Sequence, residues 1–213
     1  MLALAIRCLL AYLLGSLMGS LIVGRLYGGV DIRTQGSGNA GGTNALRTQG
    51  KVFALWVMII DIGKGVAAVW LLPVLPLPVL GGTALSGPWT AALCGILCMV
   101  GHVWPLYFGF RGGKGAATYV GVTGVLAPVA LIPLVGVFAA TLTLTGYVGL
   151  STILSGWAVA VFALIRDGAL APFFAFAVAA ACFITYTHRS NIQRLRAGNE
   201  NRFHKVMLLR KRQ

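Results

Sequence analysis

A glycine-rich segment in the first quarter of the chain combines residue types that bind phosphate. Its candidate ligands lie close together in the sequence: Gly36, Ser37, Gly38, Asn39, Thr43, Asn44 and Arg47. Glycines allow successive backbone N–H groups to converge on an anion. Hydroxyl and amide side chains add neutral donors, and a guanidinium adds a fork that matches two phosphate oxygens. A flexible linker is the alternative, but the clustered Asn, Thr and Arg side chains favour a phosphate-binding loop.

A second glycine-rich segment, Arg111-Gly112-Gly113-Lys114, immediately precedes an apolar stretch. Glycines and a lysine at a helix N-terminus favour anions, because the free N–H groups and the helix dipole both attract negative charge. The spacing is not that of a Walker A loop. We expect Gly112, Gly113 and Lys114 to bind phosphate, although plain cytoplasmic positive charge is the alternative. His102 is as compatible with a hydrogen-bonded helix end as with a substrate contact.

A third group of reactive residues lies near the C-terminus and contains His188, Asn191 and Glu200. On a helix, His188 and Asn191 would share a face. A histidine can act as a general base near neutral pH. We therefore expect a catalytic role for all three, with Glu200 orienting His188. A tail that lies on the lipid surface is the alternative, and we adopt it for residues 205–212.

Two ionisable residues, Asp61 and Lys64, stand inside an apolar run. Charged groups in such a run are costly unless they are paired or face a polar cavity. Because they are three residues apart, they can pair on one helix. Structural pairing and substrate contact are both compatible with this pattern, and Lys64 joins the candidate substrate ligands.

The composition indicates the kind of protein that must position these residues. Hydrophobic residues form 58% of the 213 residues and charged residues only 10%, whereas soluble domains are about 25% charged. The sequence therefore predicts an all-α integral membrane protein with a single domain over residues 1–213. The net charge of +13 agrees with the positive-inside rule and with anionic partners. Nucleic acid is excluded as a partner, because the basic residues occupy short loops between apolar runs.

The order of apolar and basic segments predicts the topology. The positive-inside rule places three basic segments in the cytoplasm: 25–51, 106–118 and 188–213. The N-terminus and the loop 76–88 then lie outside. The apolar runs cover roughly 8–24, 52–80, 89–108 and 116–187.

An odd number of crossings follows from this orientation, because the basic tail must lie inside. Simple hydropathy divides 116–187 into blocks that would place the tail outside. Dividing residues 116–146 near Pro128–Pro133 resolves the conflict and predicts about seven transmembrane helices, with about five as the alternative.

Together these segments resemble the bacterial acyl-phosphate:glycerol-3-phosphate acyltransferase family, PlsY. The family often has Pro at Met18, Lys at Arg111 and Ile-Gly-Ala at 40–42, and none of these departures removes a donor or a positive charge. The resemblance is carried by DIRTQGSGNAGGTNALR at 31–47, DIGKG at 61–65, GHVWPLYFGFRGGKGAAT at 101–118 and HRSNIQRLRAGNE at 188–200.

The resemblance implies a multi-pass enzyme of the cell inner membrane, with its active site facing the cytoplasm. It implies transfer of a fatty acyl group from acyl phosphate to the 1-hydroxyl of glycerol 3-phosphate, which gives lysophosphatidic acid and phosphate. The expected partners are glycerol 3-phosphate, a long-chain acyl phosphate and membrane lipid. We expect no cofactor and no metal, because the acids are scattered and the histidines are not clustered.

The sequence lacks the His-x₄-Asp pair of common glycerol-phosphate acyltransferases. The residues five positions after the three histidines are Tyr107, Gln193 and Leu209. The hydroxyl must be activated differently, either by His188 or by an oxygen of the acyl phosphate itself. Acylation of Ser37 is a third route.

Two other classes of protein compete with an acyltransferase. A membrane transporter for organic phosphates would also need buried cations and broken helices, but the chain has no convincing internal repeat. An intramembrane Ser–His protease would need Ser37 at a buried helix start, whereas Ser37 stands in a polar segment.

Overall fold

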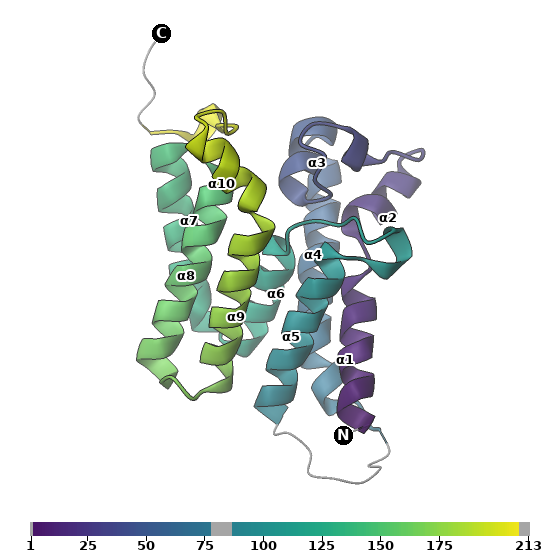
Figure 1. The fold of residues 1–213 in the computed structure, drawn as a ribbon. Helices are drawn as coiled ribbons and strands as arrows, with labels where there is room; N and C mark the ends of the chain where they lie inside the picture. Colours follow the sequence, from purple (N-terminus) through teal and green to yellow (C-terminus); the bar gives the residue numbers. More distant parts are fainter. Residues whose placement is uncertain (1, 78–86, 209–213) are drawn as a thin grey trace. The chain divides into compact units, whose positions relative to one another are not determined.

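The computed structural model describes residues 2–77 and 87–208, and its regular structure over those residues is helical throughout (Figure 1). The all-α prediction is therefore confirmed for the described part of the chain. Contacts between Cα atoms separate two compact units, Met1–Leu126 and Ala127–Gln213. The prediction of one membrane domain stays a prediction, because two compact units can belong to one domain. Most of the predicted loop 76–88 lies outside the described residues.

The first unit contains the glycine-rich segments and the first apolar runs. Its 3₁₀ helices are η1 (Ile32–Thr34), η2 (Leu72–Val74) and η3 (Leu106–Phe108). Its α-helices are α1 (Leu2–Gly15), α2 (Gly19–Leu26), α3 (Gly42–Gln49), α4 (Lys51–Trp70), α5 (Gly87–Val103) and α6 (Ala116–Leu126).

The described part of the second unit is built from three long antiparallel helices and a short polar helix. Its 3₁₀ helices are η4 (Pro128–Ala130) and η5 (His204–Val206). Its α-helices are α7 (Leu131–Thr145), α8 (Val148–Asp167), α9 (Pro172–Thr187) and α10 (Arg189–Arg196). The predicted division of residues 116–146 is present, because α6 ends just before Pro128 and α7 begins after it.

Several helices are long and apolar enough to cross a membrane. Among the residues that the structure describes, four qualify by themselves over Lys51–Val74, Gly87–Phe108, Pro128–Thr145 and Val148–Asp167. A fifth span results if α1 and α2, which are bent by 45°, count as one. α6 and α9 are shorter. These spans make the chain a multi-pass membrane protein, and α7, whose span is only 11% buried, presents an apolar surface that suits lipid.

Glycines allow the helices of the first unit to approach closely. A Cβ at Gly65 on α4 would collide with the Thr118 carbonyl of α6, and one at Gly121 on α6 with the Ile62 carbonyl of α4. Small residues at such contacts are typical of helix pairs in membranes, where close van der Waals packing drives association. The close approach agrees with the extensive packing of α4 against α6.

An apolar cluster packs against the buried side of the glycine-rich loop. It joins α2, η1, α3 and α4 through buried side chains, namely Val23, Ile32, Ala45, Phe53, Ala54 and Val57. A neighbouring cluster of Met18, Leu21 and Ala40 packs against Phe108 of η3. The loop is therefore held on a rigid base although its outer residues are polar.

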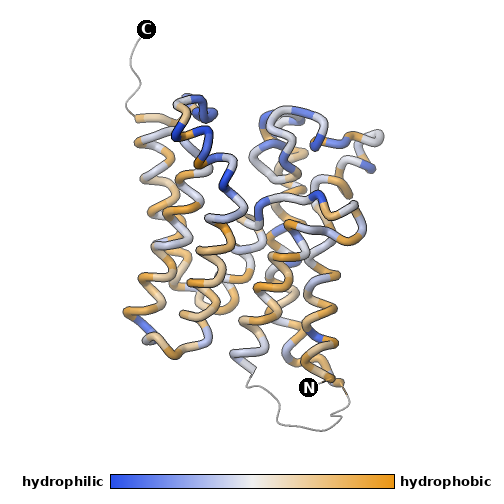
Figure 2. The backbone as a smooth tube through the Cα atoms, in the orientation of Figure 1, coloured by the Kyte–Doolittle hydropathy of each residue, from blue (hydrophilic) through white to orange (hydrophobic). Residues whose placement is uncertain are grey.

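Polar residues gather at one end of each unit. In the first unit they surround α3, at the end of the helices opposite the N-terminus (Figure 2). In the second unit they form α10 and the segment after it, at the end opposite the turn between α8 and α9 (Figure 2). Each unit thus has one predominantly apolar body and one polar end.

Candidate active site

The glycine-rich loop is shaped by Asn44, which is buried inside it. The Asn44 Nδ2 donates to the carbonyl oxygens of Ile32 at 2.9 Å and of Gln35 at 3.0 Å. Its Oδ1 accepts from the Ser37 backbone N–H at 3.0 Å. Asn44 was predicted as a substrate ligand, but in this conformation both of its amide hydrogens are engaged by the loop. It is placed to hold the loop in shape.

Ser37 stands at the outer edge of the loop between two glycines. Gly36 and Gly38 have φ values of +57° and +71°, in the left-handed region that favours glycine. The side chain of Ser37 is exposed, as are Thr43 and Arg47. With the half-buried Asn39, these side chains offer the neutral donors and the guanidinium that the sequence predicted for phosphate.

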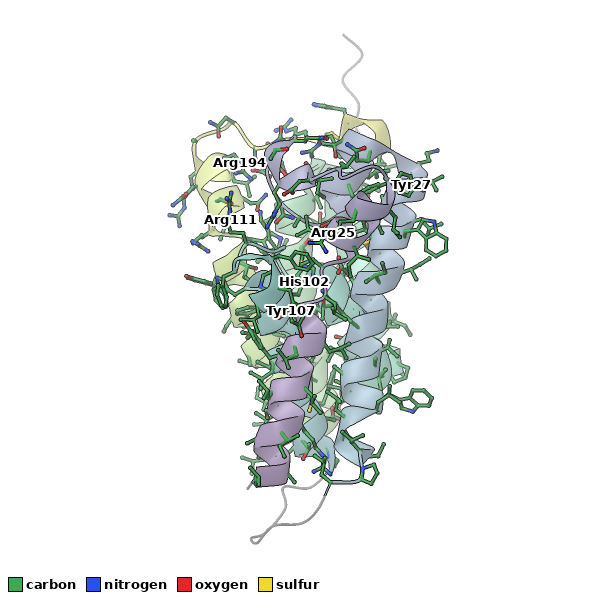
Figure 3. All side chains as sticks on the ribbon, turned by 90° about the vertical axis from the view of Figure 1, so that its right-hand side faces the viewer. Arg25, Tyr27, His102, Tyr107, Arg111 and Arg194 are labelled. Carbon is green, nitrogen blue, oxygen red and sulfur yellow. The ribbon has the colours of Figure 1, made fainter. Side chains whose placement is uncertain are left out.

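Arg33 joins this loop to the loop after α5. Its Nε and Nη2 bind the Asp31 carboxylate, the latter at 2.8 Å. Its Nη1 donates to the carbonyl oxygens of Phe108 at 3.0 Å and Arg111 at 3.1 Å. Arg25 lies over the Phe108 ring, and both Arg25 and Arg111 lie toward the polar end of the unit (Figure 3). Arginine side chains thus connect the two basic segments of this unit.

The role of Arg33 was missed in the sequence. Its guanidinium holds the pKa of Asp31 below its usual range, chiefly through the side-chain hydrogen bonds between them. A signal was available, because Asp31 is the single acid of the polar segment 25–51. An acid two residues before an arginine indicates a local pair. The contacts of Arg33 with the loop after α5 join distant residues, and no sequence pattern predicts them.

The second glycine pair packs against the end of α5. The Gly112 N–H donates to the Val103 carbonyl and the Gly113 N–H to the His102 carbonyl, both at 3.1 Å. These amides satisfy carbonyls that a helix end leaves free, so they are not available to a phosphate in this conformation. A Cβ at Gly113 would overlap the His102 imidazole. The glycines therefore allow close packing, and the half-buried Lys114 follows directly.

Lys64 and His102 form a buried cluster with Asp61. The Lys64 Nζ lies 3.0 Å from the Asp61 Oδ1 and donates to the carbonyls of Gly15 and Leu17 at 2.9 and 2.7 Å. The His102 Nδ1 lies 3.5 Å from the same carboxylate oxygen, deeper among the helices than the loops (Figure 3). All three side chains are at most 3% exposed. Of the two interpretations left open for Lys64, the structure shows the pairing.

In the second unit, Glu200 orients Asn191. The Asn191 Nδ2 donates to the Glu200 Oε1 at 2.6 Å, and the Arg194 Nε donates to the Oε2 at 2.6 Å. The Glu200 side chain is only 5% exposed. The sequence suggested that Glu200 would orient His188, but both carboxylate oxygens are directed to α10. The difference arises because the chain turns back after α10 and brings Glu200 against that helix.

His188 is buried at the junction of α9 and α10. Its Nδ1 lies 2.8 Å from the Ile184 carbonyl oxygen. Because a carbonyl can only accept, Nδ1 carries the hydrogen. In the neutral imidazole, Nε2 then has the lone pair that a general base needs.

The basic tail docks on the second unit. The Arg202 Nε donates to the Tyr147 hydroxyl at 2.7 Å. The backbone N–H groups of Phe203 and Leu208 donate to the carbonyls of Gly146 and Thr143 at 2.8 and 3.0 Å. Residues 202 and 203 thus pair with the connection between α7 and α8, and Leu208 pairs with the end of α7. The lipid-surface tail expected over 205–212 stays a prediction, because residues 209–212 lie outside the described part of the chain.

Comparisons with known proteins identify the family of the chain. A family model described as glycerol-3-phosphate acyltransferase matches residues 5–198. Glycerol-3-phosphate acyltransferases of a Synechococcus species and of Halalkalibacterium halodurans are each 42% identical, and the alignments cover 90% of this chain and 90% and 91% of theirs.

A solved structure extends the similarity to the fold. It is a crystal structure of PlsY (YgiH), an integral membrane glycerol 3-phosphate acyltransferase, in its glycerol 3-phosphate form. The TM-score is 0.84 at 30% identity, with 98% of this chain and 99% of that chain covered. The lysophosphatidic acid form has a TM-score of 0.83 at the same identity, with 97% and 98% covered.

Proposed function

The chain belongs to the glycerol-3-phosphate acyltransferase family, and from that premise we propose that it acylates the 1-hydroxyl of sn-glycerol 3-phosphate with acyl phosphate as donor. The hydroxyl oxygen forms a bond to the acyl carbon, the bond from that carbon to the phosphate oxygen breaks, and lysophosphatidic acid and phosphate leave. The observation that carries the proposal is the similarity of 98% of the chain to a PlsY structure in its glycerol 3-phosphate form. The relatives named above are acyltransferases, so they do not support the transporter alternative.

The exposed residues of the glycine-rich loop bind phosphate in this proposal. Arg47 and Lys114 supply positive charge, and Ser37, Asn39 and Thr43 donate hydrogen bonds. Support comes from the exposure of Ser37, Thr43 and Arg47 at the polar end of the first unit. The paired Asp31 adds little repulsion there, because Arg33 binds its carboxylate.

The remaining candidate residues position these groups. Gly36 and Gly38 allow the turn around Ser37, and Asn44 holds that turn from inside. Gly112 and Gly113 bring the chain close to α5 just before Lys114. Each of these roles is supported by main-chain geometry.

His188 is the general base of the proposed reaction. Its Nε2 takes the hydroxyl proton as the oxygen attacks the acyl carbon, and the departing phosphate leaves with the electron pair of the broken bond. Asn191, oriented by Glu200, directs the hydroxyl or the phosphate. The hydrogen on Nδ1 supports this assignment, since it leaves Nε2 as acceptor.

The rival mechanism makes the acyl phosphate its own base. His188→Ala distinguishes the two, because a base contributes about 10²–10⁴-fold to the rate and its loss should lower kcat to that extent. Near-native turnover would assign the proton to the substrate. A burst of acyl-enzyme that is absent in Ser37→Ala would instead indicate a covalent route.

The proposed topology has seven crossings in the inner membrane, with the N-terminus outside and the tail and active site in the cytoplasm. It counts α1 with α2 as one crossing and includes α6 and α9. The support is the positive-inside rule, together with the polar end of each unit. α6 is only about 16 Å long at 1.5 Å per residue, so its flanking backbone must be shielded by protein.

Turnover by the purified protein in lipid tests the function directly. Labelled glycerol 3-phosphate is supplied with palmitoyl phosphate and, separately, with palmitoyl-CoA. We expect lysophosphatidic acid with palmitoyl phosphate alone. Product with palmitoyl-CoA alone would overturn the donor assignment, and no product from either by folded protein would overturn the function.

A further inference from the structure

The buried cluster of Asp61, Lys64 and His102 lies at the break between the apolar helices α1 and α2. α1 ends at Gly15 and α2 begins at Gly19, with a bend of 45° between them. Such a break leaves carbonyls free at the end of one helix and N–H groups free at the start of the next. Lipid offers no partners for them, so the protein must supply these partners.

Lys64 and Asp61 supply these hydrogen-bond partners, the cation to the free carbonyls and the anion to a free N–H group. Lys64 donates to the carbonyl of Gly15, the last residue of α1, and to that of Leu17 in the break. Asp61 accepts from the Gly19 N–H at 3.2 Å at the start of α2. A cation at a helix C-terminus and an anion at an N-terminus are each favoured by the helix dipole. The pair thus stabilises the bend as well as neutralising itself.

The direction of α2 determines where part of the glycine-rich loop lies. Ser20, in the first turn of α2, donates through its hydroxyl to the Ala40 carbonyl at 2.8 Å. Both residues are buried, so this hydrogen bond is shielded from water. Ala40 follows Asn39 in the glycine-rich loop. A change in the bend would therefore move the loop.

The same cluster contacts the second glycine-rich segment, residues 111–114, through His102. One nitrogen of the ring, Nδ1, faces the Asp61 carboxylate at 3.5 Å. The Nε2 side of the ring lies so close to Gly113 that no Cβ would fit there. Lys114 is the next residue. The position of Lys114 is thus coupled to a ring that lies between Asp61 and Gly113.

We propose that Asp61, Lys64 and His102 form one positioning unit that sets both phosphate-binding segments, the loop containing Ser37 and the segment containing Lys114. The inference rests on the phosphate-binding roles proposed above. Burying three ionisable groups is costly, and an apolar replacement of a buried ion pair is often as stable. Stability alone therefore does not account for the cluster, whereas a fixed bend beside a binding site does.

A double-mutant cycle tests the link between His102 and Lys114. His102→Asn keeps an amide donor toward Asp61 but removes the ring edge that faces Gly113. We expect this variant to raise, on the order of tenfold, the KM of the same substrate whose KM Lys114→Met raises. In the Lys114→Met background, His102→Asn should add less than about twofold, because residues that act through one another are not additive.

Three results would separate the possible failures. Effects that multiply in the double variant would overturn the inference and leave the role of Lys114 intact. Native KM values in Lys114→Met alone would overturn both the role of Lys114 and the coupling. Met99→Ala, a buried change on the same helix, is the control; we expect a lower melting temperature with native KM values, and raised KM values there would overturn the inference.

The role of the Asp61–Lys64 pair must be tested in a variant that still folds. Single replacements leave a buried charge without its partner and are expected to fold poorly. Asp61→Asn combined with Lys64→Met is neutral and similar in shape. We expect this double variant to fold and to show raised KM values for both substrates, with a smaller change in kcat. Native KM values in the folded double variant would overturn the inference.

Discussion

The Asn44 carboxamide spans the glycine-rich loop from inside, and its three hydrogen bonds end on Ile32, Gln35 and Ser37. The exposed Ser37 hydroxyl is thereby held at a fixed point, although it stands in a segment with glycines on both sides. A loop of this kind can be polar on its outer face and still have one conformation. Residue-level changes should therefore divide into those that alter the loop and those that alter its ligands.

Asn44→Ala should lower both stability and substrate affinity. A buried polar group left without its partner costs about 1–3 kcal/mol, and this change leaves several such groups in the loop. We expect a lower melting temperature in detergent and raised KM values. Thr43→Ala, at an exposed neighbour, should raise KM without changing the melting temperature. A native melting temperature for Asn44→Ala would contradict the loop-shaping role.

Glu200→Gln should reduce turnover through Asn191. The substituted amide presents one acceptor where Asn191 and Arg194 both donate, and charge-assisted bonds of this kind are roughly twice as strong as neutral ones. We expect kcat to fall on the order of tenfold, whereas in the Asn191→Ala background Glu200→Gln should add no further loss. Asp167→Asn, which changes an acid paired with the neighbouring Arg166, should leave kcat near native. Additive losses would show that Glu200 acts separately from Asn191.

At the scale of helices and loops, the packing of α4 against α6 depends on the absence of two Cβ atoms. Gly121→Ala would place a methyl group against the Ile62 carbonyl, and overpacking of this kind costs about 1–3 kcal/mol. Gly136→Ala on α7 meets nothing within 4 Å and should be neutral or stabilising. Gly121→Ala should therefore lower the melting temperature, whereas Gly136→Ala should leave it unchanged or raise it. Equal melting temperatures would contradict the close approach of α4 and α6.

Arg33 connects the glycine-rich loop with η3 and the chain after it, and this connection should depend on pH. Because the pKa of Asp31 is lowered in the folded protein, the pair stabilises the fold above the ordinary Asp pKa of about 3.9. The contribution is lost as pH falls through the lowered folded-state pKa.

Arg33→Met removes this dependence. The wild type should lose more stability than the variant when pH falls from about 5 to about 3, below the ordinary Asp pKa. The measurement is the melting temperature at each pH. Salt should weaken the difference, because the pair is partly exposed. Parallel pH profiles would contradict a stabilising Asp31–Arg33 pair.

For the whole molecule, the prediction concerns the number and direction of crossings. In a background without the four native cysteines, single cysteines replace Val129, Asp167 and Asn199. With seven crossings, an impermeant thiol reagent should label the first two in intact spheroplasts and Asn199→Cys only after lysis. Protection of Val129→Cys in intact cells would favour five crossings. Labelling of Asn199→Cys in intact cells would contradict a cytoplasmic tail.

The sequence by itself determined the class of the protein and its family, and it supplied the candidate segments of the site. Composition suffices for membrane insertion, because lipid selects apolar residues without regard to tertiary contacts. Linear motifs around Ser37, Lys114 and His188 suffice for the family, because each segment is continuous in the chain. Pro128 and the basic tail together also indicated that residues 116–146 divide into two helices, and the structure has this division.

Only the tertiary structure decided which side chains support the site. Lys64 binds the carbonyl of Gly15, 49 residues away, and Arg33 binds that of Phe108, 75 residues away. The partner of Glu200 was likewise decided by how the chain turns after α10. Such pairs depend on helix packing and on which glycines permit close approach. A sequence states the charge and shape of each side chain, and the fold determines which groups it meets.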